Sequence, residues 1–309
     1  MRWDYGKIYK EIRKSKGLTQ EEIWGDFLAR STLARIESGQ VVPKFDTMIF
    51  LLRQIDMTLE EFKYICDYYQ PSQRQKILNS LYNQGESIAG TKGLLQLKRE
   101  CEAYLYKHSD IPIKHALDII NITIHLRQNG ISETKEINAT TNKIWAYLEK
   151  QDTWYESDFR LLSTILYFFP LENIKQFTQK ILNSIKKYKS FRYGNNVQIG
   201  LLVNLSTIYL YNGLKRECAE ITKYIYDLSK KEKRYDSLGL SQIRLGICKN
   251  DNELIKKGIA LLQLADEKEL EKSLKEEIEK YRWESFSNGI FMWIEVTILF
   301  VIIDKAGCF

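Results

Sequence analysis

Proline is almost absent from this chain, and its scarcity limits the folds that the chain can adopt. Only four of the 309 residues are proline, and glycine contributes 16. Sandwiches, propellers and other β folds need many tight turns, which draw heavily on these two residues. Because hydrophobic residues make up 44% of the chain and charged residues 28%, the composition is that of a core-forming globular protein. The sequence therefore predicts an all-α fold.

Residues 1–70 predict five short helices in one compact domain. Thr19 and Thr58 each precede a glutamate by three positions, a spacing that forms a capping box at the start of a helix. Gly17 is expected to end the first helix. The basic residues of that helix, Arg13 among them, are expected on its exposed face because the apolar residues follow helical spacing on the other side.

The dipeptide Pro71-Ser72 predicts a boundary, followed by a second helical domain over 71–284. Helical stretches separated by short breaks are expected near 73–84, 92–107, 112–128, 133–150, 153–168, 171–188, 195–211, 214–231, 235–248, 252–265 and 267–283. Pairs of such helices recur about every 35–45 residues, which is the spacing of tetratricopeptide-like α-solenoids. The sequence therefore predicts a solenoid of helix pairs.

The last segment, 285–309, contains an apolar stretch at 290–303 that admits three interpretations. It is a buried terminal element at the solenoid end or a dimer interface, a membrane-touching tail, or an extension outside the common fold. The stretch is shorter than the roughly 20 residues that span a bilayer, and Glu295 lies within it. We therefore favour the buried element and expect no stable membrane insertion.

One motif in the first domain is specific enough to suggest a function. The stretch LTQEEIWGDFLARSTLARIESG, residues 18–39, resembles the helix-turn-helix of the Xre/Cro-type repressors. Gln20 at a helix N-terminus is suited to hold a DNA phosphate beside free backbone N–H groups. The following helix is expected to place its N-terminal end in the major groove. The predicted DNA contacts are Gln20, Arg30, Ser31, Thr32, Arg35 and Lys44.

Two residues depart from the usual motif. Trp24 stands where a small residue normally allows two helices to cross closely, and Ala29 replaces the usual polar N-cap of the second helix. The motif is also one residue shorter than most, which predicts an atypical turn. Arg35 and Glu37 admit a local ion pair, which would give Arg35 a partly structural role.

The charge of the first domain bears on its affinity for DNA. The whole chain carries a formal charge of +6, but residues 1–70 contain eleven basic and eleven acidic residues. Because phosphate neutralisation supplies much of the affinity for DNA, a neutral domain should bind weakly alone. We therefore expect a homodimer that reads a palindromic operator in double-stranded DNA.

The domain order resembles that of the Rgg/GadR/MutR family of regulators in Gram-positive bacteria. The stretch TWYESDFRLLSTILYFF resembles the family's tryptophan–aromatic–acidic helix, with Trp154, Tyr155 and Asp158 at the matching positions. NNVQIGLLVNLSTIYLY resembles its central helix with an inward Asn204, and ELIKKGIALLQLADEKELEKSLKEEIEK resembles its closing helix pair. The resemblance covers residues 1–283. It implies a dimeric, quorum-sensing transcription regulator whose concave solenoid surface accepts a short signalling peptide.

Three residues are candidates for contacts with such a peptide: Asn204, Arg160 and Tyr209. An asparagine in an apolar helix can offer a donor and an acceptor to an extended peptide backbone. An arginine on an aromatic helix can hold a peptide carboxylate. The alternatives are that Asn204 pairs with a neighbouring helix and that Arg160 extends into solvent.

The sequence gives no indication of an enzyme, a cofactor or a metal site. It contains neither a Walker loop nor a G-x-S-x-G elbow. The three histidines, His108, His115 and His125, lack zinc-ligand spacing, and the five cysteines form no C-x-x-C pair. The charged start of the chain has no apolar stretch typical of a signal peptide, so we expect a cytoplasmic protein.

Two other functions fit the same pattern. In the first, the solenoid is a protein-interaction scaffold and the helix-turn-helix is a vestigial docking module. In the second, the protein is a phage-type or antitoxin-type repressor without a peptide ligand. Only the peptide-responsive regulator predicts both DNA binding and an effect of a peptide on that binding.

Overall fold

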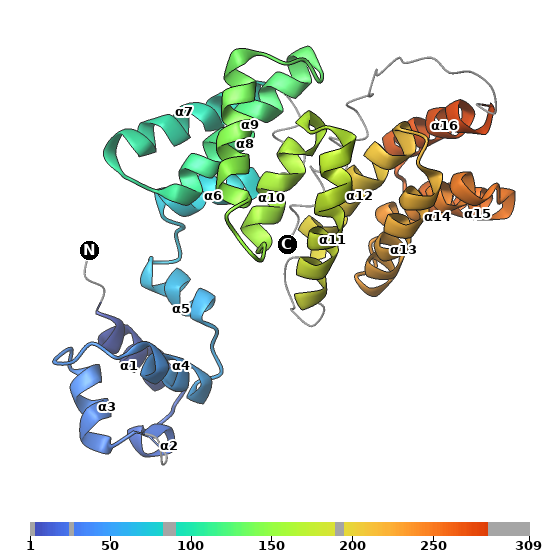
Figure 1. The fold of residues 1–309 in the computed structure, drawn as a ribbon. Coiled ribbons are helices and arrows are strands. Elements are labelled where there is room, and N and C mark those ends of the chain that lie inside the picture. The colour runs from blue at the N-terminus through green and yellow to red at the C-terminus, as the bar shows by residue number, and fades with distance from the viewer. Residues whose placement is uncertain (1–3, 25–27, 83–90, 189–194, 284–309) are drawn as a thin grey trace. The chain divides into compact units, whose positions relative to one another are not determined.

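The computed structural model describes residues 4–24, 28–82, 91–188 and 195–283, and these residues form helices joined by short connections (Figure 1). No strand occurs in the described ranges, and the predicted all-α class is confirmed. The chain divides into two compact units, Met1–Lys76 and Ile77–Phe309. The apolar stretch 290–303 lies outside the described residues.

The first unit contains the five short helices that the sequence predicts. They are α1 (Tyr5–Ser15), α2 (Gln20–Trp24), α3 (Arg30–Glu37), α4 (Phe45–Gln54) and α5 (Leu59–Cys66). Both capping boxes are confirmed at their first contact: Glu22 N–H donates to the Thr19 hydroxyl at 3.3 Å, and Glu61 N–H donates to the Thr58 hydroxyl at 3.1 Å. Gly17, with φ of +73°, follows the end of α1. Local capping therefore sets where these helices begin and end.

Helices α1 and α3 cross at close range, and a glycine makes the crossing possible. A Cβ atom added to Gly6 would lie 1.8 Å from the carbonyl oxygen of Ile36. Side chains from α1 to α5 then form one core, which includes Tyr9, Leu33 and Leu51. The Tyr9 hydroxyl is buried and donates to the Leu51 carbonyl oxygen at 3.2 Å. The first and third helices are thus fixed to each other by direct backbone approach.

The second unit is an array of helices whose limits agree with the predicted stretches to within a few residues. They are α6 (Gln73–Tyr82), α7 (Thr91–Lys107), α8 (Ile111–Asn129), α9 (Lys135–Leu148), α10 (Glu156–Ile165), the 3₁₀ turn Leu166–Phe168, α11 (Leu171–Lys187), α12 (Asn195–Tyr211), α13 (Lys215–Lys231), α14 (Tyr235–Lys249), α15 (Asn252–Leu264) and α16 (Lys268–Trp283). Helix α6 spans the boundary between the units.

The packing order of these helices is that of a solenoid. Helices α12, α13, α14 and α15 each pack against the next, and α10 packs on α12 as α14 packs on α16 (Figure 1). At the contact of α14 with α15, a Cβ atom added to Gly258 would lie 2.6 Å from the carbonyl oxygen of Gly239. Helix-pair stacking of this kind confirms the predicted α-solenoid.

A buried ion pair joins helices that are not neighbours in the chain order. The guanidinium of Arg244 on α14 donates to both carboxylate oxygens of Glu277 on α16, each at 2.9 Å. A third nitrogen of Arg244 donates to the Val203 carbonyl oxygen and the Ser206 hydroxyl of α12, at 3.1 and 2.6 Å. Every second helix of this part of the array is therefore tied by one side chain.

Candidate functional site

Helix α3 presents a polar face to solvent while its other face is buried. Leu33, Ile36 and Glu37 face the core of the first unit. Arg30, Ser31 and Arg35 are exposed on the remaining surface, whereas Thr32 is half-buried. The residues predicted to read DNA are thus gathered on one short helix, and Lys44 is exposed just before α4.

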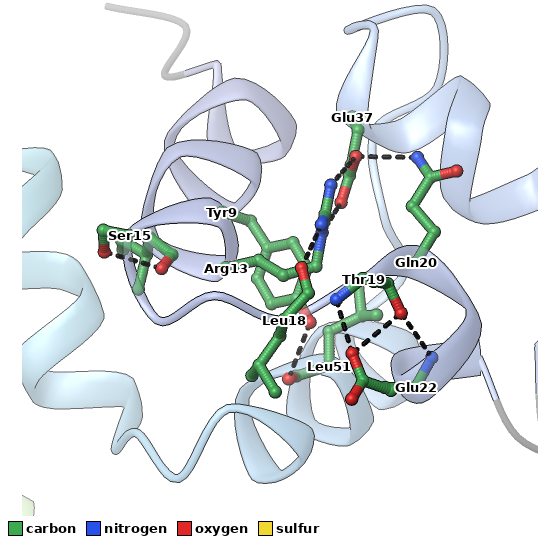
Figure 2. Close-up of polar contacts among 10 residues, drawn as sticks. Tyr9, Arg13, Ser15, Leu18, Thr19, Gln20, Glu22, Glu37 and Leu51 are labelled. Atoms are coloured by element: carbon green, nitrogen blue, oxygen red, sulfur yellow. Dashed lines mark hydrogen bonds and ion pairs between the residues drawn. The ribbon is translucent and has the colours of Figure 1, made fainter.

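A buried polar network holds the inner side of α3, as Figure 2 shows. Arg13 on α1 forms two hydrogen bonds with Glu37, at 2.6 and 2.8 Å, and also donates to the carbonyl oxygen of Leu18. The Nε2 group of Gln20 on α2 donates to the same carboxylate at 2.8 Å. One carboxylate therefore joins α1, α2 and α3.

Charge and burial act in opposite directions on Glu37. Burial alone would raise the pKa of its carboxyl, but hydrogen bonds from Arg13 and Gln20, together with the positive charge of Arg13, lower it. The hydrogen bond to Glu37 raises the pKa of Arg13 in turn. The network is therefore a fully ionised pair with its donors and acceptors matched, which is the form in which a buried charge is tolerated.

The network corrects two sequence-based expectations. Arg13 does not lie on the exposed basic face of the first helix, because only 5% of its surface is accessible. Nor does Glu37 pair with Arg35: its carboxylate is committed to Arg13 and Gln20. Periodicity placed Arg13 on the polar side of α1, but it could not show a buried partner 24 positions away. Gln20 has a second amide hydrogen in addition to the one that binds Glu37.

The two unusual residues of the motif lie at the ends of α2 and α3. Trp24 is half-buried, and the guanidinium carbon of Arg30 lies 5.5 Å from the centre of its ring. This arrangement is a cation–π contact that orients Arg30. Ala29 is the N-cap of α3 and makes no side-chain capping bond, as expected. The predicted atypical turn falls on residues 25–27, outside the described residues.

In the second unit, Asn204 is buried on α12 and bonded to α10. Its amide nitrogen donates to the hydroxyl of Ser163 at 2.7 Å and to the Ser163 carbonyl oxygen at 3.3 Å. The alternative in which Asn204 pairs with a neighbouring helix is therefore the arrangement seen. Arg160, one turn before Ser163, is paired with Glu156 at 3.1 Å and keeps 22% of its side chain exposed.

Tyr209 faces a different neighbour of α12. Its hydroxyl lies 2.5 Å from the Thr178 hydroxyl on α11. Both residues line a cavity of about 580 Å³ between α11, α12 and α13. The remaining lining residues are Gln179, Leu182, Glu217, Glu220, Ile221, Lys223, Tyr224 and Asp227. The structure thus brings Asn204 and Arg160 to α10 and places Tyr209 in a separate, largely acidic cavity, which no sequence pattern indicated.

Comparison with known families settles the class of protein. A family model for the C-terminal domain of the HTH-type transcriptional regulator Rgg matches residues 102–276, more than half of the chain. A helix-turn-helix family model matches residues 10–62. The chain belongs to the Rgg family. It is therefore a member of a family of transcriptional regulators and not of an enzyme family.

Solved structures share the fold of this Rgg-family chain over most of its length. A candidate transcriptional regulator from Listeria monocytogenes EGD-e is 19% identical with a TM-score of 0.69, covering 91% of this chain and 98% of that one. The SHP pheromone receptor Rgg2 from Streptococcus dysgalactiae is 14% identical with a TM-score of 0.66, covering 89% and 99%. ComR from S. thermophilus, in complex with DNA and its signalling peptide ComS, is 13% identical with a TM-score of 0.61, covering 90% and 99%.

Two further observations concern only the described residues. No helix in them is both long enough and apolar enough to cross a membrane. No group of three or more histidine, cysteine, aspartate or glutamate side chains in the described ranges is arranged to hold a metal ion.

Proposed function

We propose that this Rgg-family protein binds a double-stranded operator through α3 and that its helical array responds to a short signalling peptide, in the cytoplasm. The observation that carries the proposal is the two-sided character of α3. Its exposed side offers polar groups of the kind that read base edges, while Glu37 fixes its inner side to α1 and α2. A rigid, shallowly projecting helix of this kind is what the major groove accepts.

The proposed DNA contacts divide into two kinds. Arg30, Ser31, Thr32 and Arg35 are assigned to base edges and nearby phosphates because they lie on α3. Lys44 and the second amide hydrogen of Gln20 are assigned to the phosphate backbone. The exposure of Arg30, Arg35 and Lys44 supports these roles.

The proposed domains follow from the same reasoning. Residues 1–70 read DNA, and residues 71–284 sense the peptide and form the homodimer. Support for the sensing role comes from solved complexes that share the fold: ComR holds both DNA and ComS, and PlcR from Bacillus thuringiensis holds the peptide PapR7 and DNA. A dimer doubles the phosphate contacts of a domain whose own charge is balanced.

For peptide contacts we propose Arg160 and Asn204 on one side of α12 and Tyr209 on the other. Arg160 is the accessible member of the first group and suits a peptide carboxylate. Asn204 would exchange its bond with Ser163 for a bond to peptide backbone. Tyr209 has an open cavity beside it.

The test of the overall function combines DNA selection with peptide addition. Purified full-length protein is incubated with sheared genomic DNA, the bound fragments are recovered, and gel shifts of the enriched fragment are recorded with and without short hydrophobic peptides. The proposal expects enrichment of a two-fold symmetric site and a changed gel-shift midpoint with one peptide. Binding without any peptide effect would favour the phage-type or antitoxin-type repressor, and no DNA binding would favour the scaffold.

The role of Asn204 needs a control because the residue is buried. Asn204→Ala should weaken binding of a labelled active peptide in fluorescence anisotropy while leaving DNA affinity without peptide unchanged. Ser163→Ala removes the present partner of Asn204 but keeps its amide. If Ser163→Ala weakens peptide binding as much as Asn204→Ala does, Asn204 only supports the packing of α10 on α12.

A further inference from the structure

Two thiols meet where α13 packs against α14. Cys218 on α13 is fully buried, whereas Cys248 near the end of α14 is half-buried and packs against the same core. A hydrogen bond joins the two thiols. The hydroxyl of Thr222 lies 3.7 Å from the Cys218 sulfur on its other side. The pair therefore consists of one enclosed thiol and one that solvent reaches.

The surroundings of Cys248 favour a thiolate there. The hydrogen bond from Cys218 lowers the pKa of Cys248 against the opposing effect of burial, and the charges of Arg244 and Lys215 lower it further while Glu277 raises it. The same hydrogen bond and burial raise the pKa of Cys218, which thus keeps its proton. This is the division of roles seen in reactive dithiols, where one thiol stabilises the other's thiolate.

The other described cysteines differ from this pair. Cys66 and Cys101 are buried in separate cores, and burial raises the pKa of each to about 11. A buried thiol with a raised pKa is chemically inert. Cys248 is therefore distinguished from them by exposure, by a neighbouring thiol and by nearby positive charge.

We propose that Cys248 and Cys218 form an oxidation site that a hydroperoxide converts into a disulfide between α13 and α14. The Cys248 thiolate attacks one peroxide oxygen, the O–O bond breaks, and the leaving oxygen takes up a proton, which gives a sulfenic acid and water or an alcohol. The Cys218 sulfur then attacks the sulfenic sulfur, its proton passes to the departing hydroxide, and the S–S bond forms with release of water. Two thiols are oxidised and one peroxide is reduced.

The site lies beside the ion pair that ties the array together. Arg244 is one turn before Cys248 on α14 and holds Glu277 on α16 and Val203 on α12. A covalent link between α13 and α14 would thus fix the helices on either side of this ion pair. The proposal is independent of the proposed DNA and peptide binding, because it concerns only groups within the second unit.

The experiment is peroxide oxidation of the reduced full-length protein followed by thiol blocking and non-reducing peptide mass spectrometry. We expect a linked pair of peptides containing Cys218 and Cys248, lost in Cys248→Ser and retained in Cys101→Ser. In the untreated protein, Cys248 should react with iodoacetamide at least about tenfold faster than Cys101. In Cys218→Ser, dimedone should trap a sulfenic acid at Cys248.

Two results would overturn the proposal. One is the absence of the linked peptides from wild-type protein when peroxide has already oxidised its methionines. The other is equal alkylation rates at Cys248 and Cys101 in the folded protein. Both measurements use the wild-type chain, so they stand even if Cys218→Ser, at a fully buried position, fails to fold.

Discussion

Both units of the molecule contain a buried Arg–Glu pair, and the two pairs differ in what they hold. Arg13 and Glu37 join three consecutive short helices, α1 to α3, around a small core. Arg244 and Glu277 join α14 to α16 and reach α12, so they connect alternate helices of an array whose other contacts are mostly between neighbours. The first pair sets the orientation of one helix, whereas the second couples successive repeats.

The comparison separates stability from geometry. A buried ion pair adds little net stability over an apolar replacement, because desolvation offsets the attraction, but removing one partner leaves an uncompensated charge. In a solenoid each repeat normally contacts only its neighbours. We infer that the second pair makes unfolding of α12–α16 cooperative, and that the first keeps α3 in position. Substitutions at the two pairs test this difference.

The largest expected effect is that of Glu277→Gln. It leaves the fully buried Arg244 guanidinium without a counter-charge, so the free energy of unfolding should fall by about 3–5 kcal/mol. Urea denaturation followed by far-UV circular dichroism measures it. Glu253→Gln removes an exposed carboxylate of α15 that is paired with Lys256 and should change stability little. Equal losses in both variants would contradict the coupling role of Arg244.

Glu37→Gln should cost less, about 2–3 kcal/mol, because Arg13 keeps its bond to the Leu18 carbonyl oxygen and part of its access to solvent. It should also weaken operator binding, since α3 loses its link to α1 and α2. Differential scanning calorimetry and gel shifts on one preparation separate the two effects. Wild-type DNA affinity in a folded Glu37→Gln protein would show that the network does not position α3.

Gly6→Ala tests the crossing of α1 and α3 without touching any charge. The new methyl group would overlap the Ile36 carbonyl oxygen, and the backbone must move apart, at a cost of about 1–3 kcal/mol. Lys14→Ala, on the exposed face of α1, is the matched control and should leave stability close to wild type. Thermal melts of both variants give the comparison. A Gly6→Ala protein as stable as the control would mean that the helices can separate freely.

The helices could be predicted from the sequence because their signals are local. Thr19 and Thr58 open helices through contacts three residues away, and Gly17 ends one through its own backbone angle. The order of helix pairs followed from spacing alone. These features need no knowledge of distant partners, which explains why predicted and observed limits agree.

The polar core could not be predicted in the same way. Arg13 has the spacing of a surface residue, and only its distant partner Glu37 makes burial acceptable. Asn204 was singled out because it stands in an apolar helix, but its bond to Ser163 depends on how α10 packs on α12. The acidic cavity beside Tyr209 is formed by three helices, and periodicity within one helix contains no information about it.

Arg35→Ala should affect DNA binding alone. Loss of one base contact is worth about 1–3 kcal/mol, while the free energy of unfolding should stay within about 0.5 kcal/mol of wild type because the side chain is exposed. Fluorescence anisotropy on the selected operator, at fixed salt, measures the change. Arg53→Ala removes an exposed positive charge from α4 and serves as control. If both variants bind equally well, Arg35 does not read bases.

The smallest expected effect is the acid dependence of the first pair. The pKa of Glu37 is lower in the folded protein than its ordinary value of 4.5. As pH falls through 4.5, the unfolded chain therefore takes up a proton that the folded chain still excludes, and stability declines until the pH passes the lowered folded value. This contribution is fully present above pH 4.5. One proton corresponds to a slope of at most about 1.4 kcal/mol per pH unit. Urea denaturation of wild type and Glu37→Gln between pH 7 and pH 3 should give parallel curves above pH 5 and a shallower decline for the variant below it. Curves that remain parallel down to pH 3 would show that Glu37 is not an ionised partner of Arg13, and the contrast between the two units would then rest on Arg244 alone.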